Sequence, residues 1–193
     1  MPERKAPKPV SAASLEASAL FYLERFASSS GNLRQVLLRR VRRSAAAHGT
    51  DPAEGSRLVE ALVERFLGNG LLDDRAYAEA RTASLHRRGT SSRAIAAKLS
   101  AKGVGRELIG SVLGDSEDEA RPGGDLAAAA ALARRRRLGP YRPPETREPY
   151  RLKDFGALAR AGFGRSIADK VLDAADPAAL DALLAEESCS GRR

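Results

Sequence analysis

The chain has 193 residues, and its 33 lysines and arginines outnumber its 25 aspartates and glutamates, which gives a formal net charge of +8. Its only cysteine, Cys189, excludes a disulfide framework and any cysteine-based metal site. Aromatic residues make up 5% of the chain and tryptophan is absent, so we expect thin layers of secondary structure rather than one deep core.

Strong helix formers dominate the sequence, and no segment alternates apolar and polar residues in the way that strands do. The N-terminus carries Arg4, Lys5 and Lys8 without the apolar stretch of a signal peptide. No segment approaches the roughly 20 apolar residues of a membrane span. We therefore expect an all-α protein in a reducing, cytoplasmic setting, with Cys189 as a free thiol on a frayed tail.

The first predicted repeat covers residues 14–69 and follows a disordered tail over residues 1–13. Its first helix runs over 15–26 and is broken by the stretch from Ser28 to Gly31. Asn32 caps a second helix that Gly49 ends, and Asp51 caps a third with Pro52 at its first position. The expected core residues are Leu20 and Leu23, then Leu33, Leu37, Val41 and Ala45, then Leu58, Leu62 and Phe66.

The second predicted repeat covers residues 70–114. Asp73 or Asp74 caps its first helix, which runs to about His86 with Tyr77 and Ala80 facing inward. Ser91 or Ser92 caps the next helix, over 93–102, and a short helix follows Gly103. The acidic stretch 115–124 is the clearest linker in the chain.

The third predicted repeat covers residues 125–175. It has an alanine-rich helix to about Leu138, a proline-rich loop over 139–149 and a helix pair that ends at Leu172. Residues 176–193 form a short helix and a tail. The whole chain is thus predicted as three tandem three-helix, helix-turn-helix-like repeats in an elongated array.

Two segments of the chain repeat one another: 99–113, LSAKGVGRELIGSVL, recurs at 158–172 as LARAGFGRSIADKVL. In both copies a glycine, Gly103 or Gly162, stands four residues after a leucine and before an apolar residue. This spacing is typical of a Schellman stop, in which the glycine takes the left-handed conformation. Two unrelated helix ends could produce a similar pattern, but the agreement on both sides of the glycine favours a true repeat.

Charge is segregated along the chain. Five arginines and no acid lie between Leu33 and Ala47, and seven basic residues and no acid lie between Arg81 and Arg106. Ten basic residues against three acids lie between Arg134 and Arg165, whereas residues 107–125 and 166–187 are acidic. The middle helices could therefore form a basic stripe along a polyanion, although each run alone could simply be a solvated face.

Residues with catalytic or metal-binding chemistry are scarce. Asp73 and Asp74 fit helix capping better than acid–base catalysis, and His48 and His86 are isolated near predicted helix ends. The Gly-x-Gly pairs lack the pattern of a phosphate loop. We expect no catalytic residue, no metal and no cofactor, and the four tyrosines offer little for base stacking.

Residues 63–99 together with Gly103 resemble the RecX family of bacterial recombination regulators. The resemblance rests on Gly70-Leu71-Leu72-Asp73-Asp74, Tyr77-Ala78, Arg88-Gly89, Ile95, Leu99 and Lys102-Gly103-Val104, and on Leu158 to Phe163 with Ile167 in the third repeat. The first repeat departs from the pattern, since Ala45-Ala46-Ala47-His48-Gly49 replaces the Lys-Gly-apolar stop. The tail after Asp176 has no clear counterpart.

The resemblance implies a monomeric, non-enzymatic modulator that binds the RecA filament on single-stranded DNA, lies in its groove and restrains ATPase and strand-exchange activity. Such a role requires no membrane. It gives the acidic segments a possible use against basic RecA surface. The residues expected to contact DNA or the filament are Arg39, Arg42, Arg43, Arg87, Arg88, Arg93, Lys98, Lys102, Arg134, Arg135, Arg136 and Arg137.

Two alternatives remain open. A basic helical protein could coat DNA or RNA without RecA, driven by the release of counterions from phosphates. A helical scaffold could instead bind an unrelated acidic partner.

Overall fold

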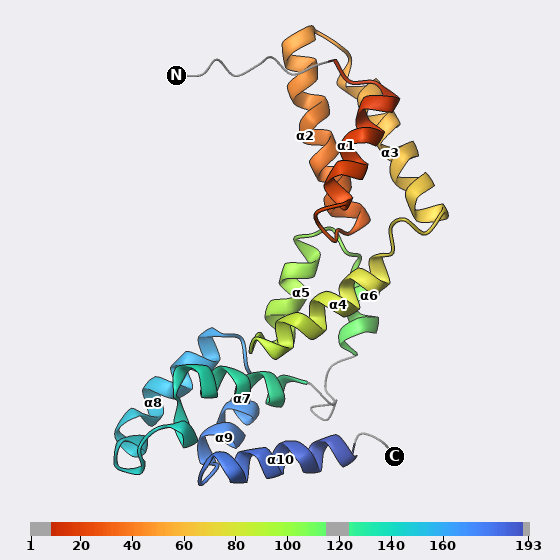
Figure 1. Cartoon of the computed structure of the whole chain (residues 1–193). Helices are drawn as coiled ribbons and strands as arrows, with labels where there is room; N and C mark the ends of the chain where they lie inside the picture. Colours follow the sequence, from red (N-terminus) through yellow and green to blue (C-terminus); the bar gives the residue numbers. More distant parts are fainter. Residues whose placement is uncertain (1–8, 115–123, 191–193) are drawn as a thin grey trace. The chain divides into compact units, whose positions relative to one another are not determined.

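The computed structural model describes residues 9–114 and 124–190, with side chains as far as residue 187. Within these residues the chain forms ten α-helices and one short 3-10 helix and contains no strand (Figure 1). The helices are α1 (Ala12–Leu23), α2 (Ser30–His48), α3 (Pro52–Gly68), α4 (Asp74–Arg87), α5 (Ser92–Ser100), α6 (Arg106–Leu113), α7 (Asp125–Arg136), η1 (Gly139–Tyr141), α8 (Pro144–Arg160), α9 (Arg165–Asp173) and α10 (Pro177–Ser190). The predicted all-α class is confirmed. Most of the expected tail and linker, and the side chain of Cys189, lie outside the described residues.

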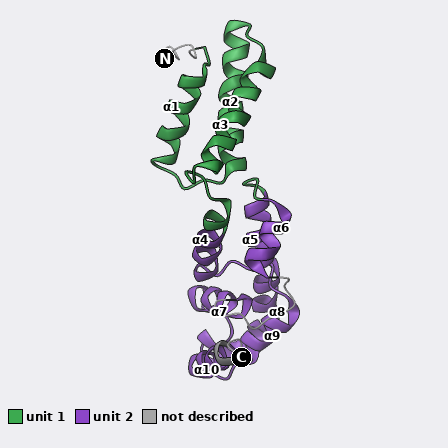
Figure 2. Ribbon diagram, turned by 90° about the vertical axis from the view of Figure 1, so that its right-hand side faces the viewer, with its two compact units in different colours: residues 1–78, 101–104 green, residues 79–100, 105–193 purple. Residues whose placement is uncertain are grey.

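The helices form two compact units (Figure 2). Unit 1 comprises residues up to Ala78 together with 101–104, and unit 2 comprises 79–100 and the residues from Gly105 onward. The core of unit 1 is built by α1, α2 and α3 around Leu15, Leu37 and Val63. The core of unit 2 is built largely by α7, α8 and α9, with alanines of α7 allowing close helix packing.

Several predicted helix ends are confirmed by their hydrogen bonds. Gly49 ends α2 with φ of 67°, and the Asp51 side chain caps α3 ahead of Pro52. Gly103 has φ of 74° and Gly162 has φ of 92°. At the second of these stops the Phe163 N–H donates to the Leu158 carbonyl at 3.2 Å, which is the closing bond of a Schellman motif.

The stretch from Ser28 to Gly31 does not break a helix as predicted. Helix α1 ends earlier, at Leu23, and α2 begins at Ser30 with Ser29 rather than Asn32 as its cap. The Ser29 side chain accepts the Asn32 N–H at 3.1 Å, so the serine run starts a helix. The serine hydroxyl readily bonds nearby backbone groups, which favours serine at a helix cap and disfavours it inside helices.

The predicted proline-rich loop over 139–149 is also wrong. Residues 139–141 form η1, and α8 begins at Pro144 and continues through Pro149. Proline at the first position of a helix loses no hydrogen bond. The Arg147 guanidinium then donates to the carbonyls of Arg142 and Pro140, which fixes the turn that the composition alone assigns to a loop.

Some predicted core positions are also corrected. Leu20 is 45% exposed, because Leu15 and Ala19 form the buried side of α1. Ala80 is exposed and its neighbour Ala78 is buried instead. The C-terminal helix is longer than predicted, since α10 has 14 residues. No described helix has the length and apolar character needed to cross a membrane.

A pair of serines at the start of α2 holds the turn between α5 and α6 and the beginning of α4. The Ser29 hydroxyl donates to the Lys102 carbonyl, and Asp74 accepts the Ser30 N–H and hydroxyl, both at 2.6 Å. Gly31 and Gly103 bring their backbones together, since a Cβ on Gly31 would lie 2.6 Å from the Gly103 oxygen. We call these contacts the α2 joint.

The same arrangement recurs inside unit 2 at the start of α5, where we call it the α5 joint. The Ser91 hydroxyl donates to the Ala161 carbonyl at 2.8 Å, and Asp125 accepts the Ser92 N–H at 2.6 Å. His86 Nε2 lies 3.1 Å from the Ser92 hydroxyl. Burial lowers the pKa of His86, and the charge of Asp125 offsets this only in part. Each joint therefore links the middle helix of one repeat to the next repeat in the sequence.

The glycine contact of the α2 joint can be tested by Gly31→Ala. Overpacking costs about 1–3 kcal/mol, whereas alanine gains at most about 1 kcal/mol in helix propensity. We therefore expect a lower Tm in thermal unfolding followed by circular dichroism. Gly68→Ala is the matched control, because no atom lies within 4 Å of the added Cβ. Equal Tm values for the two variants would contradict the backbone contact.

Candidate nucleic-acid interface

The twelve predicted contact residues are all exposed, and none forms an ion pair with a carboxylate among the described residues. Five other arginines do form such pairs: Arg34, Arg65, Arg142, Arg151 and Arg165. The positive charge of the twelve is thus not neutralised by the fold. Uncompensated cations on a helix surface are the groups that can replace counterions on a phosphate backbone.

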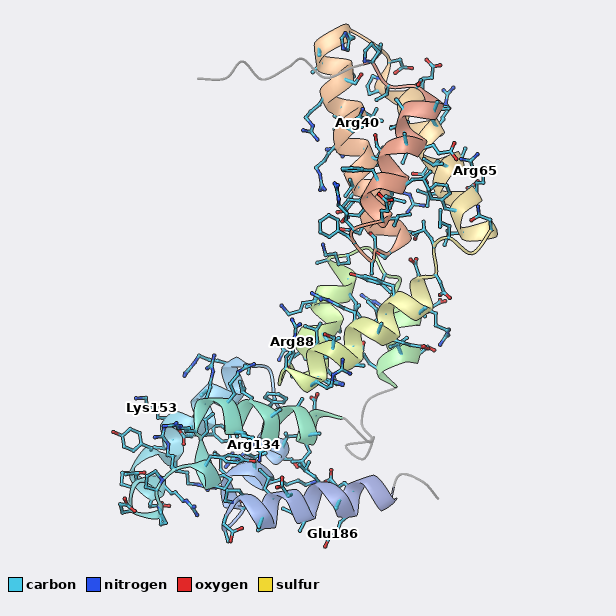
Figure 3. All side chains as sticks on the ribbon, in the orientation of Figure 1. Arg40, Arg65, Arg88, Arg134, Lys153 and Glu186 are labelled. Carbon is cyan, nitrogen blue, oxygen red and sulfur yellow. The ribbon has the colours of Figure 1, made fainter. Side chains whose placement is uncertain are left out.

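Three of the twelve lie on one face of α2 in unit 1. Arg39, Arg42 and Arg43 stand at i, i+3 and i+4, opposite the buried Leu37 and Val41. The Arg43 Nε donates to the Arg39 carbonyl at 3.3 Å, which leaves the terminal nitrogens of its guanidinium directed away from that bond. Figure 3 shows nitrogen-ended side chains along this helix, where Arg40 is labelled. We call Arg39, Arg42 and Arg43 the α2 surface.

Six more of the twelve gather in unit 2, where α4 and α7 end: Arg87, Arg88 and Arg134 to Arg137. The Arg135 Nη1 donates to the Arg88 carbonyl at 2.6 Å. Gly89 permits the approach of the two helices, since a Cβ there would lie 2.8 Å from the Leu132 nitrogen. Arg88 and Arg134 are labelled in Figure 3. We call these six residues the α4–α7 surface.

Part of this charge has a structural explanation, because cations near a helix C-terminus interact favourably with the helix dipole. That effect falls off within the last turn. Six cations at two adjacent helix ends also repel one another, which costs stability unless an anion binds between them.

The remaining three residues are not brought into these surfaces by an observed contact. Arg93 lies beside the turn at Gly162, with Cβ 4.0 Å from the position that a Gly162 Cβ would take. Lys98 is exposed on α5. In unit 1 the Lys102 Nζ donates to the Asn32 side-chain oxygen at 3.2 Å.

The expected basic stripe on the three middle helices is corrected in the third repeat. Arg134 to Arg137 end α7, the first helix of that repeat, because α7 runs as far as Arg136. The middle helix, α8, uses two of its cations within the fold. Arg147 donates to backbone carbonyls, and Arg151 Nη2 pairs with Asp173 at 2.7 Å.

One buried ion pair belongs to the fold rather than to the surface. Arg142 Nε and Nη2 donate to the two oxygens of Asp154 at 2.6 and 2.7 Å, and the Gly139 N–H donates at 2.9 Å. Burial alone would raise the pKa of Asp154, but these hydrogen bonds and the nearby charges outweigh it, so that the pKa is lowered. The pair fixes η1 against α8.

The acidic residues of the third repeat are also engaged within the fold. Asp169 lies 3.6 Å from Arg151 and 3.5 Å from Arg165, and Lys170 pairs with Glu187 at 3.1 Å. The sequence suggested that this acidic segment contacts a basic partner. These carboxylates pair with cations of the fold instead.

The described residues hold no group of three or more histidines, cysteines, aspartates and glutamates that could bind a metal ion. The two adjacent aspartates have separate tasks. Asp73 caps α4 by accepting the Ala76 N–H at 2.9 Å, and Asp74 belongs to the α2 joint. The capping interpretation therefore holds for Asp73.

One cluster has no counterpart among the residues predicted from the sequence, where only the tyrosines were weighed for stacking. Phe21 and Tyr22 lie in the last turn of α1 and Phe26 follows it, and the Tyr22 and Phe26 ring centroids are 5.2 Å apart. Their signal in the sequence is the spacing i, i+4 for both Tyr22–Phe26 and Phe21–Arg25.

Arg137 has an unusual backbone conformation and gives a test of the α4–α7 surface. It is the only described non-glycine residue with positive φ, at 53°, whereas α4 ends with Gly89 in the corresponding conformation. A left-handed conformation costs a non-glycine residue about 1–2 kcal/mol. We expect Arg137→Gly to raise Tm by about 2–8 °C while weakening the binding of a single-stranded oligonucleotide. Arg137→Ala serves as the control, since it removes the charge and keeps the strain. A glycine variant that gains stability without losing affinity would remove Arg137 from the surface.

Comparison with known proteins places these features in a family. Residues 73–113 match the family model described as RecX, second three-helix domain. The chain is 46% identical over 170 residues to a regulatory protein RecX from Myxococcus xanthus, covering 88% of this chain and 89% of that protein. It is 38% identical over 155 residues to the one from Agrobacterium fabrum, covering 80% and 79%.

A crystal structure of regulatory protein RecX has a similar fold, with a TM-score of 0.58 and 23% identity, covering 84% of this chain and 71% of that one. The fold of three-helix repeats and the similarity over most of both chains agree with the resemblance seen in the sequence. The chain belongs to the RecX family of regulatory proteins.

Proposed function

We propose that this chain is a cytoplasmic, monomeric and non-enzymatic regulator that binds the RecA filament on single-stranded DNA, lies in its groove and inhibits ATPase and strand-exchange activity. Membership of the RecX family supports a regulatory role. The observation that carries the proposal is the set of twelve exposed cations without acidic partners among the described residues. Such charge favours a target that presents phosphates.

The proposal assigns separate tasks to different groups of cations. The α2 surface and the α4–α7 surface contact DNA phosphates or acidic filament surface, and Arg93, Lys98 and Lys102 supplement them. Guanidinium groups suit both targets, since they bind phosphates and carboxylates in a bidentate way.

The proposal can be tested by reversing the charge of the α2 surface with Arg39→Glu, Arg42→Glu and Arg43→Glu. We expect the concentration needed for half-inhibition of RecA's DNA-dependent ATPase to rise by about tenfold or more, because phosphate contacts are lost and repulsion is added. The helical circular-dichroism signal should stay intact, since the three side chains are exposed. The matched control replaces the same residues by lysine, which keeps the charge. Unchanged inhibition by the glutamate variant would remove α2 from the interface.

The second candidate is direct coating of nucleic acid without RecA, which the same uncompensated cations favour. A direct binder holds single-stranded DNA alone, and its affinity falls steeply as salt rises, with a logarithmic slope of about −0.7 per phosphate contacted. We expect fluorescence anisotropy to give weak, salt-sensitive binding to DNA alone and much tighter binding to the RecA filament. Equal affinity for DNA with and without RecA would favour the second candidate.

A further inference from the structure

The end of α1 exposes aromatic rings that the core does not use. Phe21 and Phe26 are each 56% exposed, although both belong to a chain in which aromatic residues make up only 5%. The Arg25 guanidinium lies over the Phe21 ring, and the Phe26 ring packs against that of Tyr22. Because exposed phenylalanine surface gives up the stabilisation that burial would bring, two such residues close together in the sequence indicate a use outside the fold.

This cluster is held in place by hydrogen bonds to α2. The Tyr22 hydroxyl accepts from the Asn32 side-chain nitrogen at 2.9 Å, and the same nitrogen donates to Ser28 at 2.7 Å. The Asn32 oxygen accepts from Lys102 at 3.2 Å. Asn32 is itself buried and lies within the α2 joint. The Tyr22 ring, against which Phe26 packs, is therefore held in place, which reduces the entropy lost when a ligand stacks there.

A cation lies directly over one of the rings. The Arg25 guanidinium lies 3.7 Å from the centroid of Phe21, on one face of a ring that is still more than half exposed. Lys102 bonds the oxygen of the Asn32 amide, whose nitrogen donates to the Tyr22 hydroxyl. Arg39 and Arg43 follow Asn32 on the same side of α2, at rises of roughly 10 and 16 Å along the helix. An aromatic end thus continues into the cationic α2 surface within unit 1.

The corresponding position in the second repeat carries two candidate phosphate contacts. Ser29 and Ser91 have the same place in the two joints, so Arg25 and Phe26 correspond to Arg87 and Arg88. The first repeat therefore has a ring where the second has a guanidinium. An aromatic ring at a position that faces a polyanion favours a ligand that has flat, stackable groups between its phosphates.

We propose that Phe21, Tyr22 and Phe26, with Arg25, form a stacking platform for unpaired bases of a single DNA strand whose backbone follows the α2 surface. The inference rests on the proposed function, in which this chain contacts single-stranded DNA. Exposed aromatic rings flanked by arginine are the usual means of binding bases without sequence readout. A purely apolar protein partner would not account for the guanidinium over Phe21 or for the cationic α2 surface of the same unit, so we favour the nucleic acid.

The test compares oligothymidine with an abasic strand of the same length, which has the phosphates and lacks the bases. Binding of the full chain is measured by fluorescence anisotropy at one salt concentration. We expect the wild-type chain to prefer oligothymidine by about 5- to 100-fold, which corresponds to the stacking of about one base. Phe21→Ala with Phe26→Ala should abolish this preference and leave the affinity for the abasic strand unchanged.

Two further variants keep the comparison free of folding effects. Phe21→Tyr with Phe26→Tyr retains both rings and should retain the preference, whereas Leu71→Ala removes an exposed apolar side chain of unit 1 elsewhere and should change nothing. Reversal of the charge of the α2 surface should weaken the binding of both strands alike. Far-UV circular dichroism and Tm confirm that each variant folds.

Three outcomes would overturn the platform. In the first, the wild-type chain binds both strands equally or binds neither. In the second, the alanine variant loses affinity for both strands equally. In the third, the alanine variant keeps the base preference and loses only capture of RecA, which would mark the rings as a protein contact. RecA ATPase inhibition is measured in parallel on the same variants. If the chain inhibits RecA but shows no base preference, the platform is rejected and the regulatory function is kept. If the chain shows base preference but does not inhibit RecA, the regulatory function is rejected and the platform is kept.

Discussion

Two adjacent serines perform two hydrogen-bonding tasks at each joint, at α2 within unit 1 and at α5 within unit 2, and the packing inside each unit depends on them. The first serine caps its own helix and donates to a carbonyl at the end of the next repeat's middle helix, Lys102 or Ala161. The second offers its N–H to an aspartate that begins that repeat, Asp74 or Asp125. Because these N–H groups at a helix start have no partner within the helix, the joint satisfies them and orients a carboxylate toward the positive end of the helix dipole.

Much of the fold follows from local sequence. Gly49, Gly162 and Asp51 mark helix ends by their own chemistry, and the structure has them there. The wrong predictions occur where a residue distant in the sequence determines the local structure. Ser29 replaces Asn32 as a cap because its hydroxyl also meets a carbonyl 73 residues away. The prolines near residue 144 join a helix because Arg142 and Asp154 fix the turn before it, and no composition rule contains that contact.

The candidate interface was likewise predictable only in part. Runs of arginine are visible in the sequence, but the sequence cannot show which of them lack acidic partners. Arg151 lies in the same basic run as Arg134, yet it pairs with Asp173 across two helices. The aromatic cluster was missed because only the tyrosines were weighed for base stacking, and the exposure of Phe21 depends on the burial of Leu15 and Ala19 within α1, which the sequence pattern did not identify.

The α2 joint also bears on where this chain can be cut. A fragment that stops after α3, near residue 69, contains three complete helices, but it lacks the carboxylate of Asp74 and the carbonyl of Lys102. The Ser30 amide, the Ser29 hydroxyl and the flat backbone at Gly31 would then face water with their partners removed. Residues 101–104 belong to the same compact unit as the first repeat, so a fragment that keeps the α2 joint intact needs the chain as far as residue 104.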